Sequence, residues 1–350
     1  MTYQRPNFRH PDAPTNPLGY TRRDYEGSIS TLCAGCGHDS ISAAIIEACF
    51  GLPLEPHRIA KLSGIGCSSK TPAYFLGRSH GFNSVHGRMP SVATGASLAN
   101  NELVYIGVSG DGDSASIGMG QFAHVVRRNL NMTYIVENNG CYGLTKGQDS
   151  ATADRGSKSK KGASNPYEAI DLASLAIQLG ATFVARSFSG DRHQLVPLIQ
   201  AALSHKGFAL LDVMSPCVTF NNHTGSTKSY VHVRDHIDPA PVDFVPIRDE
   251  IKASYEAGTT FEVRMHDGSV VRLHKDSGQE YDIEDPQAAL RAIAEHEQAG
   301  RTLTGLLYID KDAPDLHKVL GTSPRPLNSM QEKDLCPGSK MLDSINAGLR

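Results

Sequence analysis

The chain has 350 residues, which is long enough for one large domain or two ordinary ones, and its hydrophobic content of 39% is sufficient to bury a core. Its 34 basic and 37 acidic residues are mixed along the sequence and give a formal charge of −3. Because no strongly basic surface is indicated, this composition argues against nucleic-acid or anionic-membrane binding and favours a small-molecule site.

The N-terminal segment and the cysteine content indicate the cellular compartment. The first 20 residues are polar and rich in proline, which argues against the apolar core of a signal peptide, and no stretch approaches the length of a membrane span. We therefore expect a cytoplasmic protein. Seven cysteines are an odd number, and a reducing compartment keeps them as thiols, so metal binding or redox chemistry explains them better than disulfides.

Helical and strand patterns alternate through most of the chain. Residues 1–27 are rich in proline and show no regular period, which indicates an extended arm. From Asp39 onward, amphipathic helices alternate with nearly continuous apolar strands, a pattern typical of a mostly parallel, doubly wound α/β sheet with helices on both faces. Helices are expected within 39–48, 89–101, 116–129, 166–180 and 191–207, and strands within 58–63, 103–110, 132–138, 181–187 and 208–214.

The pattern changes near residue 255. The stretch 261–274 alternates about Asp267 and Gly268, a pair that favours a two-residue hairpin turn. A helix over 285–298 and a strand over 302–310 follow, and the last 40 residues predict an extended tail. The expected parts are an arm (1–27), an α/β domain (28–254), a C-terminal extension with the hairpin, helix and tail (255–350), and, within the domain, a polar loop (149–165) that is mobile unless a ligand orders it.

Three loops follow strands of the expected sheet and begin at Gly64, Gly110 and Asn138. In an open parallel sheet, such loops meet at one crevice, where ligands bind. The stretch "GDGD", residues 110–113, lies between a strand and a helix, an arrangement that suits phosphate. The alternative is that these loops are ordinary turns without a ligand.

Two kinds of phosphate ligand fit these loops. The stretch that begins at Gly110 satisfies the glycine fingerprint of dinucleotide binding, with Glu137 near the position of a ribose-binding acid. However, a carboxylate at Asp111 repels a bare pyrophosphate and attracts one that is bridged by Mg²⁺. The amide of Asn139 and the backbone carbonyl of Cys141 can supply further oxygen ligands, which favours a magnesium-diphosphate site.

Six motifs occur in order between residue 31 and about residue 230. They are "CAGCGH", "SGIGCSSK", "HGRMPSVATGASLAN", "GDGDSASIGMGQ", "ENNGCYGLTKGQDSAT" and "MSPC". Together they resemble the beta subunits of the 2-oxoacid:ferredoxin oxidoreductases, most of all the 2-oxoglutarate branch. This resemblance implies a thiamine diphosphate-binding fold in which Asp111, Asn139 and the Cys141 carbonyl hold Mg²⁺.

The resemblance also implies a 4Fe-4S cluster, whose thiolates match Cys33, Cys36, Cys67 and Cys217. Each of these cysteines is flanked by glycine or proline, which suits a turn that wraps around a cluster. Spacing alone leaves zinc as an equal alternative, and a CxxC motif can also be a redox dithiol. By resemblance, the Cys67 loop touches the thiamine cofactor, where electrons are generated, and zinc cannot accept them. Cys49 falls within an expected helix and suits the core.

Cofactor and substrate contacts follow from the same resemblance. A lysine at Lys146, seven residues past Asn139, suits the distal carboxylate of a dicarboxylic 2-oxoacid, and Lys70 suits the carboxylate beside the keto group. For both lysines, and for His86, the alternative is an ordinary loop residue. The expected cofactor contacts are Ile65, Gly66, Cys67, Ser68, His86, Gly112, Asp113, Gly143 and Leu144.

The implied activity is the reversible, thiamine-dependent oxidative decarboxylation of 2-oxoglutarate with coenzyme A to succinyl-CoA and CO₂, with electrons passing to ferredoxin. The chain shows no second α/β unit for the glutamate that activates the cofactor, so an alpha subunit is expected to supply it, within an α2β2 heterotetramer. Pyruvate or a broad range of 2-oxoacids are alternative substrates. A non-redox thiamine decarboxylase or synthase and a non-catalytic metal scaffold subunit are alternative functions.

Overall fold

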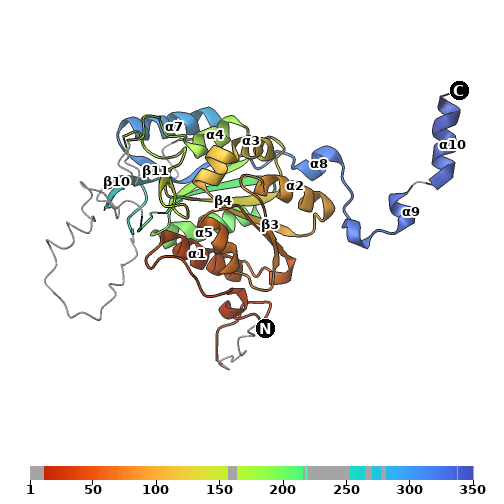
Figure 1. The fold of residues 1–350 in the computed structure, drawn as a ribbon, viewed down its shortest axis with the longest axis horizontal. Helices are drawn as coiled ribbons and strands as arrows, with labels where there is room; N and C mark the ends of the chain where they lie inside the picture. The colour runs from red at the N-terminus through yellow and green to blue at the C-terminus, as the bar shows by residue number, and fades with distance from the viewer. Residues whose placement is uncertain are drawn as a thin grey trace.

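A nine-stranded sheet forms the centre of the computed structural model (Figure 1). The structure describes residues 12–156, 164–215, 217–219, 253–264, 270–276, 281–336 and 338–349. The strands of the sheet are β1 (Ile59–Ser63), β2 (His80–Asn83), β3 (Val104–Gly110), β4 (Met132–Asn138), β7 (Phe183–Phe188), β8 (Phe208–Met214), β9 (Thr260–Arg264), β10 (Val270–Lys275) and β11 (Thr302–Ile309). Their spatial order is β2-β1-β3-β4-β8-β7-β11-β10-β9.

Six of these strands form a parallel block. Each neighbouring pair from β2 through β1, β3, β4 and β8 to β7 is parallel. The central strands are buried on both faces, as Tyr105 and Ile106 of β3 and Ile135 and Val136 of β4 illustrate. Continuous apolar strands are what a sheet covered on both faces requires. The predicted parallel, doubly wound sheet is confirmed.

Helices cover both faces of the sheet (Figure 1). They are α1 (Gly37–Gly51), α2 (Met89–Ala99), α3 (Met119–Arg127), α4 (Leu172–Gln178), α5 (Arg192–Ser204) and α7 (Pro286–Gln298). On one face, Ile41 and Ile45 of α1 share a core with Leu195 and Ile199 of α5. The opposite core contains Phe122 of α3 and residues of α2, α4 and α7. In the described ranges, no helix combines the length and the apolar character needed to cross a membrane.

The C-terminal strands extend this same sheet. Strand β11 pairs antiparallel with β7 and parallel with β10, and β10 pairs antiparallel with β9. The hairpin expected over 261–274 is therefore present, with Arg264 opposite Val270, while its predicted turn at Asp267 and Gly268 lies outside the described residues. The segment after residue 255 thus contributes strands to the central sheet, and its boundary as a separate part stays a prediction.

The end of the chain carries helices that the sequence analysis did not predict. Three helices follow β11: α8 (Leu316–Leu320), α9 (Glu332–Leu335) and α10 (Gly338–Gly348). The prediction of a tail without helices was therefore wrong. Helix α8 is fixed to the domain because the Leu316 amide donates to the Asn129 carbonyl at 3.0 Å. Helices α9 and α10 extend away from the sheet, and none of their residues is buried (Figure 1).

The described part of the N-terminal arm, residues 12–27, lies against α1. The Tyr25 side chain is fully buried, and its hydroxyl donates to the Leu54 carbonyl at 2.7 Å. The same hydroxyl accepts a hydrogen bond from Asn16 Nδ2 at 2.7 Å. The Tyr25 ring also contacts the Phe50 ring edge to face, with 5.8 Å between their centroids. These contacts fix the arm on the domain surface beside the end of α1.

A buried lysine on β1 supports the loop region that leads to the sheet edge. Lys61 Nζ donates to the carbonyls of Phe75 at 2.6 Å and Leu76 at 3.0 Å. Leu76 has a φ of 47°, in the left-handed region, so these bonds help to hold a strained turn. Burial lowers the pKa of Lys61 to about 8. A neutral amine still has two N–H donors, one for each carbonyl.

We predict that the stabilising effect of Lys61 increases with pH. Between pH 8 and the ordinary lysine pKa of 10.5, the folded chain has lost the Lys61 proton while the unfolded chain retains it, so the free energy of unfolding rises with pH. Relative to Lys61→Met, the gain from about pH 7.5 to about pH 10 is about 2 kcal/mol. Urea unfolding of the wild type and of Lys61→Met across this pH range measures the free energies of unfolding. A difference between the two proteins that does not change with pH would contradict the prediction.

Candidate functional site

A cleft lies at the carboxyl ends of β1, β3 and β4. Loops that are distant in sequence meet there, as expected for an open parallel sheet. All of the predicted cofactor-binding and magnesium-binding residues line this cleft. The lining residues are His38, Ile65, Gly66, Cys67, Ser68, His86, Gly110, Asp111, Gly112, Asp113, Glu137, Asn139, Cys141, Tyr142, Gly143, Leu144 and Thr145.

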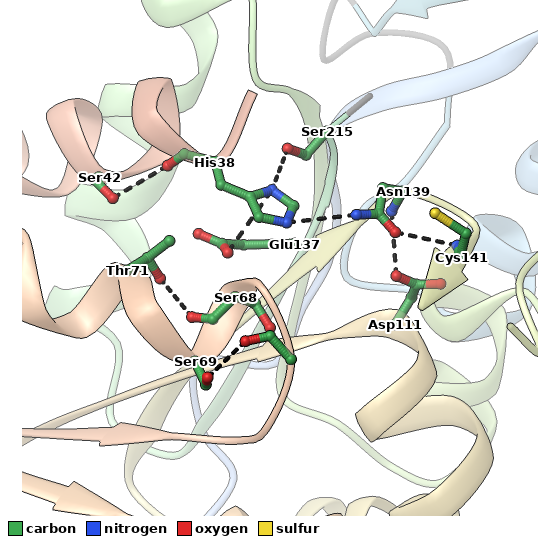
Figure 2. Close-up of polar contacts among 11 residues, drawn as sticks. His38, Ser42, Ser68, Ser69, Thr71, Asp111, Glu137, Asn139, Cys141 and Ser215 are labelled. Carbon is green, nitrogen blue, oxygen red and sulfur yellow. Dashed lines mark hydrogen bonds and ion pairs between the residues drawn. The ribbon is translucent and has the colours of Figure 1, made fainter. Parts of the chain in front are cut away.

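Asp111 is the buried carboxylate at the centre of this cleft, with 1% of its surface exposed. Its Oδ2 accepts hydrogen bonds from Ser150 Oγ and, at 2.7 Å, from Thr152 Oγ1. Its Oδ1 accepts the Asn139 backbone N–H at 3.2 Å, and Asn139 Oδ1 accepts the Cys141 N–H at 3.1 Å (Figure 2). Burial raises the pKa of Asp111, and these hydrogen bonds oppose that rise.

The loop after Asp149 contributes directly to this arrangement. It was predicted to be mobile unless a ligand orders it, and residues 157–163 lie outside the described residues. At its start, Ser150 and Thr152 donate to the Asp111 carboxylate. The sequence analysis missed both hydroxyl groups, because nothing in their sequence pattern links them to a residue some 40 positions earlier.

The donor set of the cleft fits a magnesium-bound diphosphate. Asp111 and Asn139 bring together the carboxylate and amide oxygens that Mg²⁺ prefers, and the Cys141 carbonyl follows two residues later. In addition, the buried Ser68 Oγ has no hydrogen-bond partner among the described residues and lines the cleft. An unpartnered buried hydroxyl at a cleft is what a polar ligand would satisfy.

Asp113 has a positioning role in this cleft. Its Oδ1 accepts the Gly87 N–H at 2.8 Å, and its Oδ2 accepts Ser109 Oγ at 2.8 Å. Gly87 has a φ of 68°, and a Cβ there would lie 2.7 Å from the Gly118 backbone, so this position requires glycine. Both oxygens of Asp113 are thus engaged within the protein, where they hold the loop that carries His86 against β3.

His38 and Glu137 form a buried pair that the sequence analysis did not place in the site. His38 Nδ1 lies 2.6 Å from Ser215 Oγ and 3.8 Å from Glu137 Oε2, and its Nε2 lies 3.5 Å from Asn139 Nδ2 (Figure 2). Burial lowers the pKa of His38 to about 4 and raises that of Glu137. Burial thus disfavours the charged form of both side chains. Glu137 faces this histidine, which gives no support to a ribose-binding role.

The predicted cluster cysteines gather at one side of the cleft. Thr219 Oγ1 donates to Cys33 Sγ at 3.2 Å, which joins the segment after Cys217 to the CxxC turn. The Cys217 thiol raises the pKa of both Cys36 and Cys67 by electrostatic repulsion, after the larger effect of burial. Cys49 is buried in the α1 core, as predicted.

Cys141 adds a fifth thiol to this group. The sequence analysis used only its carbonyl, but its side chain interacts with that of Cys217, which together with burial raises the pKa of Cys141. Within the described part of the chain, no three His, Cys, Asp or Glu side chains are arranged to hold a metal ion. The thiols therefore converge without forming a closed ligand set, while the raised pKa values of Cys36, Cys67 and Cys141 mean that a cationic group would stabilise their thiolates.

The two predicted substrate lysines do not line the cleft. Lys146 is exposed in the turn between β5 (Cys141–Tyr142) and β6 (Gln148–Asp149), directly after the lining residue Thr145. Its φ of 81° is unfavourable for a side chain other than glycine. Lys70 is half-buried and lowers the pKa of Cys67, against the larger effect of burial, so it lies on the cysteine side.

Comparison with known proteins connects this cleft to thiamine enzymes. Residues 64–213 match the family described as thiamine pyrophosphate enzyme, C-terminal TPP binding domain. The structure is similar to a solved 2-oxoglutarate:ferredoxin oxidoreductase from Magnetococcus marinus with 2-oxoglutarate, coenzyme A and succinyl-CoA bound. That match has a TM-score of 0.69 and 29% identity, and it covers 93% of this chain and 97% of the other.

Three relatives show where the sequence similarity lies. 2-Oxoacid:ferredoxin oxidoreductase 1, subunit beta, from Aeropyrum pernix is 45% identical over 194 residues, 55% of this chain and 60% of the relative. 2-Oxoglutarate oxidoreductase subunit KorB from Mycobacterium tuberculosis is 42% identical over 194 residues, 54% of this chain and 51% of the relative. 2-Oxoglutarate synthase subunit KorB from Methanocaldococcus jannaschii is 39% identical over 207 residues, 58% of this chain and 74% of the relative.

The extent of these matches defines what they establish. The match spans less than two thirds of the Aeropyrum and Mycobacterium relatives, but almost three quarters of the Methanocaldococcus relative. The thiamine-binding family match contains the strands and loops that form most of the cleft. The chain belongs to the family of 2-oxoacid:ferredoxin oxidoreductase beta subunits.

Proposed function

We propose that this chain is the thiamine- and cluster-binding subunit of an enzyme that oxidatively decarboxylates 2-oxoglutarate. The second substrate is coenzyme A, the products are succinyl-CoA and CO₂, and the electrons pass through a 4Fe-4S cluster to ferredoxin. The names of the KorB relatives and of the Magnetococcus structure support this choice of substrate.

The observation that carries the proposal is the buried Asp111 carboxylate beside Asn139. Asp111 is almost fully buried, and hydroxyl and amide donors hold it, with no lysine or arginine among the lining residues of the described cleft. A carboxylate in such a place fits a site that is completed by a divalent cation and its diphosphate. A turn without a ligand gives no reason to bury this charge.

This chain's residues would hold the cofactor and orient it. Asp111, Asn139 and the Cys141 carbonyl would bind Mg²⁺, and Ser68 Oγ could donate to the ligand. Gly112 leaves space for the Tyr142 ring, because a Cβ there would lie 2.5 Å from that ring, whose hydroxyl donates to the Gly112 carbonyl at 3.0 Å. When bound, thiamine diphosphate supplies the electron sink that decarboxylation requires. The glutamate that activates it would come from an alpha subunit, in an α2β2 assembly.

The gathered thiols support an electron-transfer role. We propose that Cys33, Cys36, Cys67 and Cys217 bind the 4Fe-4S cluster, because soft thiolate ligands on adjacent turns suit such a cluster. The Cys67 thiol is also a lining residue of the cleft. A cluster there would lie next to the bound cofactor and could accept its electrons. A non-redox decarboxylase needs no such electron acceptor.

We predict that Cys217→Ser lowers the iron and acid-labile sulfide content of the anaerobically prepared complex by more than about half, because one of four cluster ligands is lost. Absorbance near about 400 nm should fall in parallel. Cys49→Ser is the matched control, since Cys49 is buried in the α1 core, and should leave the iron content unchanged. Stoichiometric zinc without sulfide in the wild type would rule out the cluster.

Lys146 is the residue through which this chain would recognise a dicarboxylic substrate. It extends the hairpin whose residues Gly143, Leu144 and Thr145 line the cleft. Its ammonium group could meet the distal carboxylate of 2-oxoglutarate, whereas pyruvate has no such group. The position of Lys146 and Lys70 outside the lining favours one second candidate, an enzyme that accepts pyruvate or a broad range of 2-oxoacids.

We predict that the wild-type complex with its alpha subunit turns over 2-oxoglutarate with coenzyme A and reduces ferredoxin. Lys146→Gly should lower kcat/KM for 2-oxoglutarate relative to pyruvate by roughly ten- to a hundredfold, because a charge-assisted hydrogen bond is lost. Glycine suits the φ of 81°, so stability should not fall, and Lys146→Arg should retain the preference. An unchanged substrate ratio would exclude Lys146, and no thiamine-dependent turnover by the wild type would refute the function.

A further inference from the structure

A buried ion group lies beneath the cleft, in the centre of the sheet. Arg186 of β7 is opposite Asp212 of β8 in the parallel register, and its Nε donates to Asp212 Oδ2 at 3.1 Å. Its Nη2 donates to Asp171 Oδ1 at 2.7 Å. Arg186 and Asp212 are both buried. Such groups cost several kcal/mol of desolvation per ion, and apolar side chains would fill the same space without that cost.

Hydrogen bonds connect this ion group to the cleft. Asp212 Oδ1 accepts Asn138 Nδ2 at 3.0 Å, and Asn138 Oδ1 accepts Thr152 Oγ1 at 3.0 Å. Thr152 Oγ1 also lies 2.7 Å from Asp111 Oδ2, as a donor. A continuous chain of polar contacts therefore runs from Arg186 to the proposed metal-binding carboxylate.

The donor and acceptor roles along this series of hydrogen bonds depend on the charges of Arg186 and Asp212. Burial raises the pKa of Asp212 and Arg186 opposes that rise; in the structure both Asp212 oxygens accept hydrogen bonds, Oδ2 from Arg186 and Oδ1 from Asn138. Asn138 must then turn its NH₂ group toward Asp212 and its carbonyl oxygen toward Thr152. Thr152 Oγ1 lies within hydrogen-bond distance of Asp111 Oδ2, Asn138 Oδ1 and Ser150 Oγ, so its single hydrogen can turn away from Asp111, to Asn138 or Ser150, when a cation binds Asp111.

We propose that Arg186 and Asp212 are positioning residues that act through Asn138 and Thr152 to prepare the Asp111 carboxylate for its metal ion. The inference rests on the proposed function, because it assumes the magnesium-diphosphate site. Asn138 is also the residue before Asn139, whose backbone N–H donates to Asp111, so the same contacts fix the second proposed ligand. Partners of this kind, one step behind the ligands, are needed to orient a metal site.

Asp212→Asn tests the direction of these hydrogen bonds, because asparagine has nearly the same size and shape as aspartate. Arg186 still requires an acceptor, so the new amide turns its oxygen to Arg186 and its NH₂ group to Asn138, which reverses the Asn138 amide. Thr152 then receives a hydrogen from Asn138 and loses that acceptor, so its own hydrogen points to Asp111 or Ser150 and competes more often with the cation at Asp111. We expect the affinity for thiamine diphosphate in the presence of Mg²⁺ to fall about ten- to a hundredfold.

Two further variants make the experiment decisive. Thr152→Val removes the hydroxyl through which Asn138 reaches Asp111, so Asp212→Asn should cause little further loss of cofactor affinity in the Thr152→Val background. Asp191→Asn is the matched control, because Asp191 is a buried carboxylate that pairs with Lys275 at 2.7 Å and caps α5, outside the cleft lining. It should lower stability without changing cofactor affinity.

The measurement is calorimetric titration of the complete complex with thiamine diphosphate and Mg²⁺, with thermal unfolding recorded in their absence. The expected result is weaker binding in Asp212→Asn, little further loss from Asp212→Asn in the Thr152→Val background, and unchanged affinity in Asp191→Asn. Unchanged affinity in Asp212→Asn, the same loss from Asp212→Asn with and without Thr152, or an equal loss in the control would overturn the inference. Absence of Mg²⁺-dependent binding by the wild type would instead overturn the proposed function.

Discussion

The burial of the Asp111 carboxylate is the constraint on which the cleft depends. A carboxylate that is 1% exposed must receive hydrogen bonds or a cation, because water cannot reach it. Its partners come from two later segments, the loop after β4 and the loop that contains Ser150 and Thr152. Each donor can reach Asp111 only when β3 and β4 are adjacent and in register. The hydrogen bonds to Asp111 therefore require this topology of the sheet.

The central fold was predictable because its signals are local. Apolar strands such as β3 and β4, separated by amphipathic helices, leave few arrangements other than a parallel sheet covered on both faces. The position of β11 was not predictable in the same way, since nothing within Thr302–Ile309 indicates that it lies antiparallel beside β7. The helices of the tail were missed although α10 carries Met341, Leu342 and Ile345 at helical spacing, a local signal that the sequence analysis did not use.

The candidate site shows the same difference between residues with local sequence signals and residues that depend on distant contacts. Asp111 and Asn139 stand directly after strands, so their convergence follows from the order of elements. Ser150, Thr152 and the His38–Glu137 pair act through contacts between distant segments, which carry no spacing rule. Arg186 and Asp212 are charges within apolar strands, a local signal that the sequence analysis did not use. A buried charge in a parallel strand needs a partner on a neighbouring strand, and the structure supplies it in the Arg186–Asp212 register.

The charge balance of the cleft links metal and phosphate binding. Burial raises the pKa of Glu137, which faces His38, and both oxygens of Asp113 hold the Gly87 loop and Ser109. Asp111 lies beside Asn139 and Cys141, and the lining residues of the described cleft include no lysine or arginine. A diphosphate alone would meet only repulsion from Asp111, while a divalent cation leaves a net positive charge beside it. Under the proposed function, each ligand therefore creates the site that the other requires, and the polar chain beneath Asp111 determines how readily the carboxylate accepts the cation.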